Sequence, residues 1–280
     1  VEVTDKRLPG TIHSVAEAIR SDGGEATAVQ MNMRDPESIT NGVAQTVEDL
    51  GSLDIIVNNA AILVPGSLET VQDRHLDLIW QIDLRGPLLL MKYGLPHLKE
   101  AGGGDIINIS SVAGVFPGSG PYDTTPSRRE GSFYGMVKSA LERFSQGLAR
   151  ELQGDKIKVN VLSPQGRIKT PGNIWAENDP DNPSLEFEAA DEMGKAGVWI
   201  CGQPKEYTGH ILFDQDVCNE QRLKTALQIP VTRTSLPSVD LRLIHTSDIH
   251  LGDPYGHPAS IQALQKVVNA VSDQKTDYLL

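Results

Sequence analysis

Cysteine is scarce in this sequence, where Cys201 and Cys218 are the only two in 280 residues. Their spacing matches neither a disulfide framework nor a metal-binding pattern, so we expect two small buried thiols. Positively charged residues are also few. The sequence has 25 Lys and Arg and 37 Asp and Glu, which gives a net charge of −12. Such a chain is not attracted nonspecifically to phosphate backbones or anionic lipid. We therefore expect a small neutral or polar substrate and no nucleic-acid partner.

Long apolar runs are absent as well. No stretch approaches the roughly eighteen apolar residues of a membrane helix, and the polar start from Val1 to Arg7 has no signal-peptide core. These absences predict a cytoplasmic protein without a membrane partner. With 39% hydrophobic and 22% charged residues, the composition is that of a globular protein rather than a disordered or fibrous one.

Helical periodicity alternates along the chain with short apolar runs. The runs predict buried strands at Ala26 to Met31, Leu53 to Val57, Asp105 to Ser110, Ile157 to Leu162 and His210 to Phe213. Periodicity predicts helices at Ile12 to Arg20, Asp35 to Leu50, Leu76 to Leu98, Phe133 to Leu152 and Glu186 to Ile200. The alternation predicts an α/β fold, a doubly wound parallel sheet with helices on both faces, in which ligands bind beyond the carboxyl ends of the strands.

The pattern changes after Cys218. Residues 219–240 mix charge, proline and scattered Ser and Thr without a period, which predicts a linker. Beyond it, a strand at Leu241 to Thr246, a helix at Ala259 to Val271 and the start of another strand are predicted. We therefore expect a main domain over 1–218, a linker over 219–240 and a short β-α-β fragment over 241–280 that is too small to bury its own core.

Tyr134 and Lys138 stand four positions apart at the start of a predicted helix, so both side chains lie on one face. A phenol with an unperturbed pKa of about 10 is a poor base at neutral pH, but a nearby ammonium stabilises the phenolate and lowers that pKa. Tyr134 would then serve as an acid or base. The same spacing occurs on ordinary amphipathic helices, so the rest of the sequence must decide between the two interpretations.

Four motifs occur in a fixed order at the ends of predicted strands and at the start of that helix. They are Asn58-Asn59-Ala60-Ala61, Ile109-Ser110-Ser111, Tyr134-Gly135-Met136-Val137-Lys138 and Asn160-Val161-Leu162-Ser163-Pro164. Together they resemble the short-chain dehydrogenase/reductase family across roughly residues 1–216. Leu8 to Ile12 is similar, more loosely, to its hydroxysteroid-dehydrogenase-like members. The resemblance implies a Rossmann-like fold and an NAD- or NADP-dependent oxidoreductase that interconverts a secondary alcohol and a carbonyl by hydride transfer.

The resemblance also implies roles for matching residues. Ser111 would hydrogen-bond the reacting oxygen, Tyr134 would exchange a proton with it, and Lys138 would lower the phenol pKa and hold the nicotinamide ribose. The family's catalytic Asn corresponds here to Asp83, which accepts hydrogen bonds but cannot donate them when ionised. The residues that would border the cofactor are Asn58, Ala60, Pro164, Ile168 and Thr170. Ordinary strand-end and turn roles are the alternative for Ser111 and for the last three of these.

Asn32 has two interpretations. It stands where the family usually has an Asp near the adenine of the cofactor, and it also precedes Asp35 at the start of a predicted helix, where Asn often caps. Both remain open.

The family begins with a strand, a glycine-rich turn and a helix that binds the cofactor diphosphate. No Gly-x-x-x-Gly-x-Gly is present at the corresponding place. Because the missing strand would be central, we expect two unpaired sheet edges and an uncovered apolar face. We also expect the cofactor to bind more weakly than in the low micromolar range.

A second resemblance is confined to about the last forty residues. Leu243 to Gly252 resembles the opening of calcineurin-like metallophosphoesterases, in which an Asp-x-His after a strand supplies ligands to a two-metal centre. Asp248 and His250 are the matching metal ligands. The later ligands of that family are absent, so we expect that divalent metals are not held and that there is no phosphoesterase activity.

Three functions remain open on the sequence. The first is a dehydrogenase acting on a small-molecule alcohol or carbonyl, the second a metal-dependent phosphoesterase represented by its first segment, and the third a noncatalytic dehydrogenase remnant. The four ordered motifs favour the first. The family usually associates through the helix that carries Tyr and Lys, so the resemblance also implies a homodimer or homotetramer.

Overall fold

The computed structural model describes residues 11–64, 66–122, 132–170, 173 and 187–221, together with the backbone of two strands at 242–246 and 277–279. Helices and strands alternate along this part of the chain, as the sequence predicts. In chain order they are α1 (Ile12–Ser21), β1 (Glu25–Thr27), α2 (Pro36–Leu50), β2 (Ile55–Asn58), α3 (Asp73–Trp80), η1 (Gln81–Arg85), α4 (Gly86–Glu100), β3 (Gly104–Ile109), η2 (Val112–Gly114), α5 (Ser132–Glu151), η3 (Gln153–Asp155), β4 (Ile157–Ser163), α7 (Asp191–Cys201), β5 (Ile211–Phe213), α8 (Asp214–Glu220), β6 (Arg242–Thr246) and β7 (Asp277–Leu279).

Short polar side chains define where the first helices begin. Thr11 caps α1 by accepting the backbone N–H of Ser14 at 3.0 Å, and the Ser14 hydroxyl accepts the Thr11 N–H in return. Asp35 caps α2 by accepting the N–H of Glu37 at 3.0 Å. Each cap satisfies backbone donors that the helix itself leaves unpaired. Gly51 ends α2 with φ 87°, a left-handed conformation that glycine adopts without strain.

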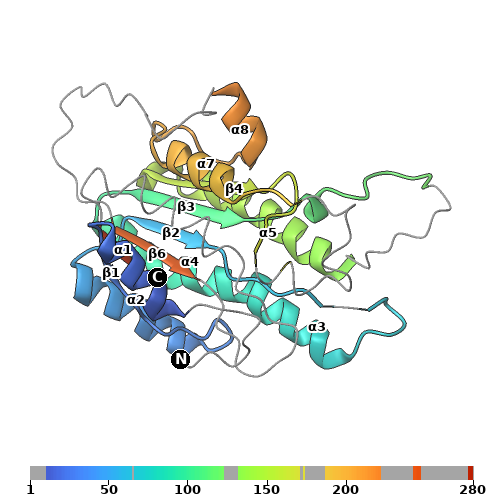
Figure 1. The fold of residues 1–280 in the computed structure, drawn as a ribbon, viewed down its shortest axis with the longest axis horizontal. Helices are drawn as coiled ribbons and strands as arrows, with labels where there is room; N and C mark the ends of the chain where they lie inside the picture. Colours follow the sequence, from blue (N-terminus) through green and yellow to red (C-terminus); the bar gives the residue numbers. More distant parts are fainter. Residues whose placement is uncertain are drawn as a thin grey trace.

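Within the described part of the chain, seven strands form one sheet in the order β1-β7-β6-β2-β3-β4-β5 (Figure 1). Every neighbouring pair is parallel. The register sets Asn58 of β2 beside Asn108 of β3, and Asn108 beside Val161 of β4. The carboxyl ends of these three strands therefore lie along one edge of the sheet.

The two C-terminal strands occupy the place where the sequence predicts a gap. β6 pairs with β2, with Ile244 opposite Ile56 (Figure 1). β7 pairs with both β6 and β1. This corrects the expectation of unpaired edges at β2 and β1, and the division into a main domain, a linker and a β-α-β fragment stays a prediction. A parallel apolar strand satisfies the backbone groups of β2 wherever in the chain it originates.

Helices cover both faces of the sheet (Figure 1). On one face, α2, α4 and α5 bury a cluster that includes Ile56 of β2 and Ile106 of β3. On the other face, α1, α7 and α8 bury a second cluster that includes Val57 and Ile107 of the same strands. Because successive strand residues point to opposite faces, each apolar strand contributes to both clusters. The predicted doubly wound α/β fold is confirmed.

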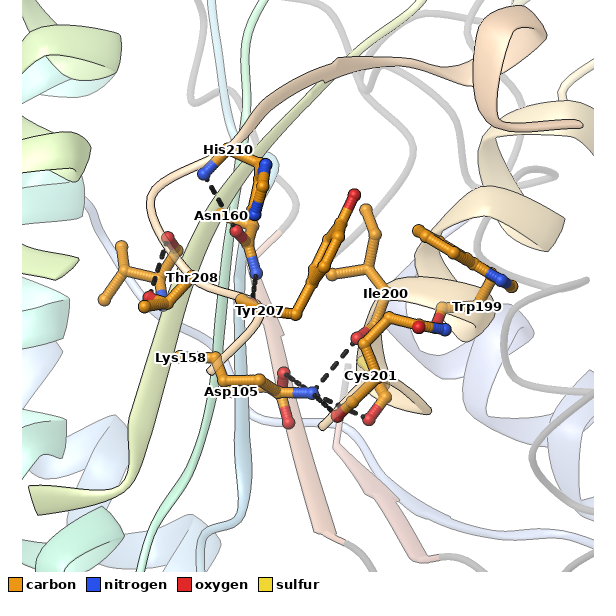
Figure 2. Close-up of polar contacts among 11 residues, drawn as sticks. Asp105, Lys158, Asn160, Trp199, Ile200, Cys201, Tyr207, Thr208 and His210 are labelled. Atoms are coloured by element: carbon orange, nitrogen blue, oxygen red, sulfur yellow. Dashed lines mark hydrogen bonds and ion pairs between the residues drawn. The ribbon is translucent and has the colours of Figure 1, made fainter. Parts of the chain in front are cut away.

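A buried ion pair lies at the amino-terminal edge of the sheet (Figure 2). Lys158 of β4 and Asp105 of β3 are register partners, and Lys158 Nζ lies 3.0 Å from Asp105 Oδ1. The same ammonium donates to the carbonyl oxygens of Ile200, Cys201 and Gln203 at 3.1, 3.0 and 2.7 Å. These carbonyls are at the carboxyl end of α7, where a cation is stabilising. Lys158 therefore joins α7 to two strands.

Candidate active site

Four predicted side chains lie close together beyond the carboxyl end of β3. Ser111 directly follows this strand, Tyr134 and Lys138 are on α5, and Asp83 is in η1, which contacts α5. Tyr134 interacts with Ser111 and Asp83, and Lys138 interacts with Asp83. The fold thus brings together residues that are separated in the sequence.

Ser111 positions its hydroxyl beside the phenol of Tyr134. The Ser111 Oγ caps η2 by accepting the N–H of Ala113 at 3.2 Å. Burial raises the pKa of Tyr134 above its ordinary value, the carboxylate of Asp83 raises it further, and the hydrogen bond with the Ser111 side chain only partly offsets them. Tyr134 therefore carries its proton at neutral pH.

Lys138 is buried between α5 and the end of β3. Its Nζ donates to the carbonyl oxygen of Ile109 at 2.9 Å and lies 5.4 Å from the centroid of the Tyr134 ring. Burial lowers the pKa of Lys138, and the carboxylates of Asp83 and Glu142 oppose this. The Lys138 ammonium thus lies near the Tyr134 ring and binds Ile109, and its lowering of the phenol pKa stays a prediction.

Asp83 is completely buried in a π-helical turn. The sequence predicts one helix from Leu76 to Leu98, whereas α3 and α4 are separated by this turn. Such turns within α-helices are frequent at functional sites. The Asp83 Oδ1 accepts the backbone N–H of Ile62 at 2.9 Å. This bond fixes the carboxylate between the segment after β2 and helix α5.

Glu142 is a site residue that the sequence reasoning missed. It is buried on α5, and its Oε1 accepts a hydrogen bond from Ser110 Oγ at 2.5 Å. Its charge favours the ammonium form of Lys138. The available signal was its position four residues after Lys138, which places both side chains on one helix face. Glu142 therefore supports both the end of β3 and the charge of Lys138.

Gly135, the neighbour of Tyr134, allows α5 to approach the turn after Ser111. A Cβ at this position would lie 2.5 Å from the carbonyl oxygen of Ala113. We expect Gly135→Ala to lower the free energy of unfolding by about 1–3 kcal/mol, the usual cost of overpacking, despite the higher helix propensity of alanine. Urea unfolding measures this change.

Gly147→Ala is the matched control on the same helix. The nearest atom to a Cβ at Gly147 is Arg143 Nη1 at 3.7 Å, an ordinary contact. This variant should gain up to about 1 kcal/mol from helix propensity. Equal stability of the two variants would contradict a close approach at Gly135.

Comparison with known proteins identifies the family. A family model for short chain dehydrogenases matches residues 3–180. The chain belongs to the short-chain dehydrogenase family. Among the curated relatives, hydroxysteroid dehydrogenase-like protein 2 of Bos taurus is 32% identical over 220 residues, and that of Homo sapiens is 30% identical over 222 residues. Each match covers 78% of this chain and 50% of the relative, so the chain spans about half the length of these curated relatives.

Solved short-chain dehydrogenase structures share the fold. A short chain dehydrogenase from Mycobacterium thermoresistibile is 27% identical with a TM-score of 0.66, and the match covers 82% of this chain and 78% of that one. Another from Burkholderia cenocepacia J2315, in complex with NADP, is 26% identical with a TM-score of 0.60 over 72% of this chain and 80% of that one. The predicted Rossmann-like fold is therefore confirmed.

The predicted cofactor residues at the carboxyl end of β2 have buried side chains. Asn58 Nδ2 donates to Asn108 Oδ1 at 2.7 Å, and Asn108 Nδ2 donates to Ser145 Oγ at 2.8 Å. Ala60 is part of the apolar cluster on the α5 side of the sheet. The Asn58 side chain thus links two strands to α5. A contact of either residue with a dinucleotide stays a prediction, and would involve the backbone.

The predicted cofactor residues after β4 form a hydrogen-bonded turn. Ile168 is buried in the α7-side cluster, and its carbonyl oxygen accepts Asn173 Nδ2 at 2.8 Å. The hydroxyl of Thr170 accepts the Asn173 N–H at 3.1 Å. The N–H that follows Pro164 donates to Asp214 Oδ1 at 2.9 Å. These bonds fit the ordinary turn role, and contacts with the cofactor stay a prediction.

Asn32 makes hydrogen bonds in the turn that precedes α2. Its Oδ1 accepts the backbone N–H of Arg34 at 3.1 Å, and its own N–H donates to Ser38 Oγ at 2.9 Å. Asp35 is the residue that caps α2. Asn32 thus makes a local turn before the cap, and its place near an adenine stays a prediction.

The predicted metal ligands Asp248 and His250 lie outside the described residues. Within the part of the chain that is described, no group of three or more His, Cys, Asp or Glu could hold a metal ion. No helix in that part is both long and apolar enough to cross a membrane. Both cysteines are free thiols, with Cys218 buried and Cys201 partly exposed. The phosphoesterase alternative therefore stays untested.

Proposed function

We propose that this chain is an NAD- or NADP-dependent oxidoreductase that interconverts a secondary alcohol and a carbonyl. The main support is the convergence of Ser111, Tyr134 and Lys138 around a buried carboxylate at the carboxyl edge of the sheet. The NADP complex of the Burkholderia relative supports a nicotinamide cofactor.

The residues around Tyr134 suit the nicotinamide half of such a cofactor. Lys138 has an ammonium with three N–H donors, one of which goes to Ile109, and the oxygens of two ribose hydroxyls can accept hydrogen bonds from such a group. Ala60 and Ala61 follow β2 with small side chains, which permit a dinucleotide to approach the backbone closely. The described residues thus fit this half of the cofactor.

The proposed mechanism assigns one task to each side chain. A bound nicotinamide supplies or takes up the hydride. Ser111 orients the substrate oxygen, and the Tyr134 hydroxyl donates its proton to that oxygen as negative charge develops on it. Burial and Asp83 raise the pKa of Tyr134, so the phenol carries the proton that this step transfers. Glu142 and Asp83 favour the charged form of Lys138.

The test is titration of the 280-residue chain with NADH and NADPH, followed by nicotinamide fluorescence. We expect saturable binding that Lys138→Met weakens about tenfold, equivalent to about 1.4 kcal/mol. Lys99→Met is the matched control, because Lys99 is half-exposed on α4 and pairs with Asp155 at 2.8 Å. Absence of binding by the folded wild type, or unchanged affinity in Lys138→Met, would contradict the proposal. The dissociation constant also tests the expected weak affinity.

A further inference from the structure

The segment that follows β4 is held by the start of α8. The pairing of β4 with β5 ends at Ser163 and Phe213, which are register partners. Asp214 is the next residue after Phe213, so it lies at the carboxyl edge of the sheet, next to the start of the 164–170 segment. It is completely buried. A buried carboxylate requires hydrogen-bond donors, and this segment supplies one of them.

One oxygen of Asp214 accepts two backbone N–H groups. The N–H of Gln165 donates to Asp214 Oδ1 at 2.9 Å, and the N–H of Gln215 donates to the same oxygen at 2.8 Å. Because Pro164 has no N–H, Gln165 supplies the first backbone donor after β4. Burial and two nearby carboxylates raise the pKa of Asp214 to about 6 against the effect of these bonds, so the group is ionised at neutral pH. Hydrogen bonds to an ionised acceptor are the stronger kind.

Glu188 holds the same segment farther along. Its N–H donates to the carbonyl oxygen of Arg167 at 2.6 Å, and its carbonyl oxygen accepts the N–H of Lys169 at 2.8 Å. The Glu188 Oε1 in turn accepts a hydrogen bond from Gln215 Nε2 at 2.5 Å. The first two residues of α8 therefore hold the 164–170 segment, one directly at its start and the other through Glu188.

We propose that Asp214 is a positioning residue for the cofactor, because its carboxylate fixes the start of the 164–170 segment. The inference rests on the proposed function, since the family resemblance is what assigns Pro164, Ile168 and Thr170 to the cofactor. Asp214 acts through the backbone N–H of Gln165 and takes no part in proton transfer. A backbone that is held in one arrangement before binding loses less conformational entropy when a ligand binds, so the affinity for the cofactor depends on this bond.

Two substitutions separate the hydrogen-bond acceptor from its charge. Asp214→Ala removes the acceptor for both N–H groups. Asp214→Asn retains an oxygen in the place of Oδ1, and its amide nitrogen takes the place of Oδ2, which has no hydrogen-bond partner among the described residues. The neutral amide also removes the repulsion from the carboxylates of Glu188 and Glu192. We therefore expect Asp214→Asn to fold and to keep the segment in place.

Thr208→Val is the matched control at the other edge of the same two strands. The Thr208 Oγ1 accepts the backbone N–H of Val159 at 2.9 Å. This variant thus also removes a side-chain acceptor from a backbone N–H of the β4 region. Thr208 precedes β5, whereas Asp214 follows it, so the control leaves the 164–170 segment untouched.

The dissociation constants of NADH and NADPH, followed by nicotinamide fluorescence at neutral pH, are the first readout. For the preferred cofactor we expect Asp214→Ala to weaken binding about tenfold, Asp214→Asn to stay within about threefold of the wild type, and Thr208→Val to cause no change. Circular dichroism identifies the variants that fold. A folded Asp214→Ala that binds as tightly as the wild type, or an equal loss in Asp214→Asn, would overturn the proposal and leave the proposed function intact. Absence of binding by the wild type would overturn both.

Hydrogen exchange of the Gln165 amide, followed by NMR, is a second readout that requires neither a substitution nor a cofactor. The bond to a buried carboxylate should slow its exchange at least about a hundredfold relative to the unfolded chain. Asp214→Ala should lose this protection and Asp214→Asn should keep it. The Val161 amide, which donates to the carbonyl oxygen of His210 at 2.9 Å, should stay protected in every variant. An unprotected Gln165 amide in the folded wild type would overturn the proposal even if Asp214→Ala does not fold.

Discussion

Lys158→Met is expected to lower the free energy of unfolding by about 3–5 kcal/mol, the usual cost of removing one partner of a buried ion pair. The Lys158 side chain is 4% exposed, lies 3.0 Å from Asp105 Oδ1 and donates to three carbonyl oxygens at the end of α7. Methionine retains the apolar stem but supplies no donor. Urea unfolding at pH 7, with calorimetry as a second probe, measures the loss.

Lys99→Met is the control for a surface ion pair. Lys99 and Asp155 lie 2.8 Å apart with 48% and 37% of their side chains exposed, so we expect a loss below about 1 kcal/mol. A Lys158→Met variant as stable as this control would show that the buried ammonium does not hold α7 on the sheet.

The protonation of Asp105, the carboxylate of the buried pair, makes the free energy of unfolding depend on pH. Burial raises the pKa of Asp105 from 3.8 to about 6, against the opposing effect of Lys158, so the folded chain binds this proton more tightly than the unfolded chain. The contribution of Asp105 to the unfolding free energy therefore falls as the pH rises from about 4 to about 6. In Lys158→Met the fall should extend to higher pH, because the cation that lowers the pKa is gone.

Asp105→Asn should remove the fall in unfolding free energy that Asp105 causes, both in the wild type and in Lys158→Met. Asp214, with a pKa raised by burial to about 6, contributes in the same direction and remains in every variant. Differences between variants thus isolate Asp105. Superimposable profiles for the wild type and Asp105→Asn would contradict the assignment.

Tyr134→Phe is expected to lower kcat by about 10²–10⁴-fold, the usual contribution of a positioned acid or base. Phenylalanine retains the ring beside Lys138 but removes the proton donor, so affinity for the nicotinamide cofactor should change little. Initial rates with NADH or NADPH across a panel of ketones measure the effect on any substrate that the wild type reduces.

Tyr93→Phe on α4 is the matched control. Tyr93 is partly buried against the same core cluster as Tyr134 and lacks contacts with the four candidate site residues among its described interactions. Loss of the Tyr93 hydroxyl should leave kcat within about twofold of the wild-type value. Equal rates for Tyr93→Phe and Tyr134→Phe would mean that Tyr134 does not transfer the proton.

The sequence predicts the central strands closely because their signal is local. The apolar runs starting at Leu53, Asp105 and Ile157 lie within a few residues of β2, β3 and β4 as observed. A strand buried on both faces requires a continuous apolar run, and that run is visible in the sequence itself. Ser111, Tyr134 and Lys138 lie close together in the structure, and the motifs that carry them lie at element ends.

The parts that the sequence did not predict depend on contacts between distant residues. The π-helical turn at Asp83 accompanies a hydrogen bond to Ile62, and helical periodicity contains no sign of it. The raised pKa of Tyr134 depends on burial and on where the fold places Asp83, and the sequence spacing to Lys138 contains neither. The partner of β6 could not be predicted either, because an apolar run does not specify its neighbour in a sheet.

The pairing of β6 with β2 has a consequence for how the chain folds as it is made. Ile55 and Leu243 are register partners separated by 243 − 55 = 188 positions. At a synthesis rate of about 5–20 residues per second, β2 leaves the ribosome roughly 10–40 s before its partner exists. During that interval the edge of β2 is open to other nascent chains, and closing so long a loop is slow. Completion of the sheet is therefore a late event in folding, and chaperones that shield strand edges should increase the yield of native protein.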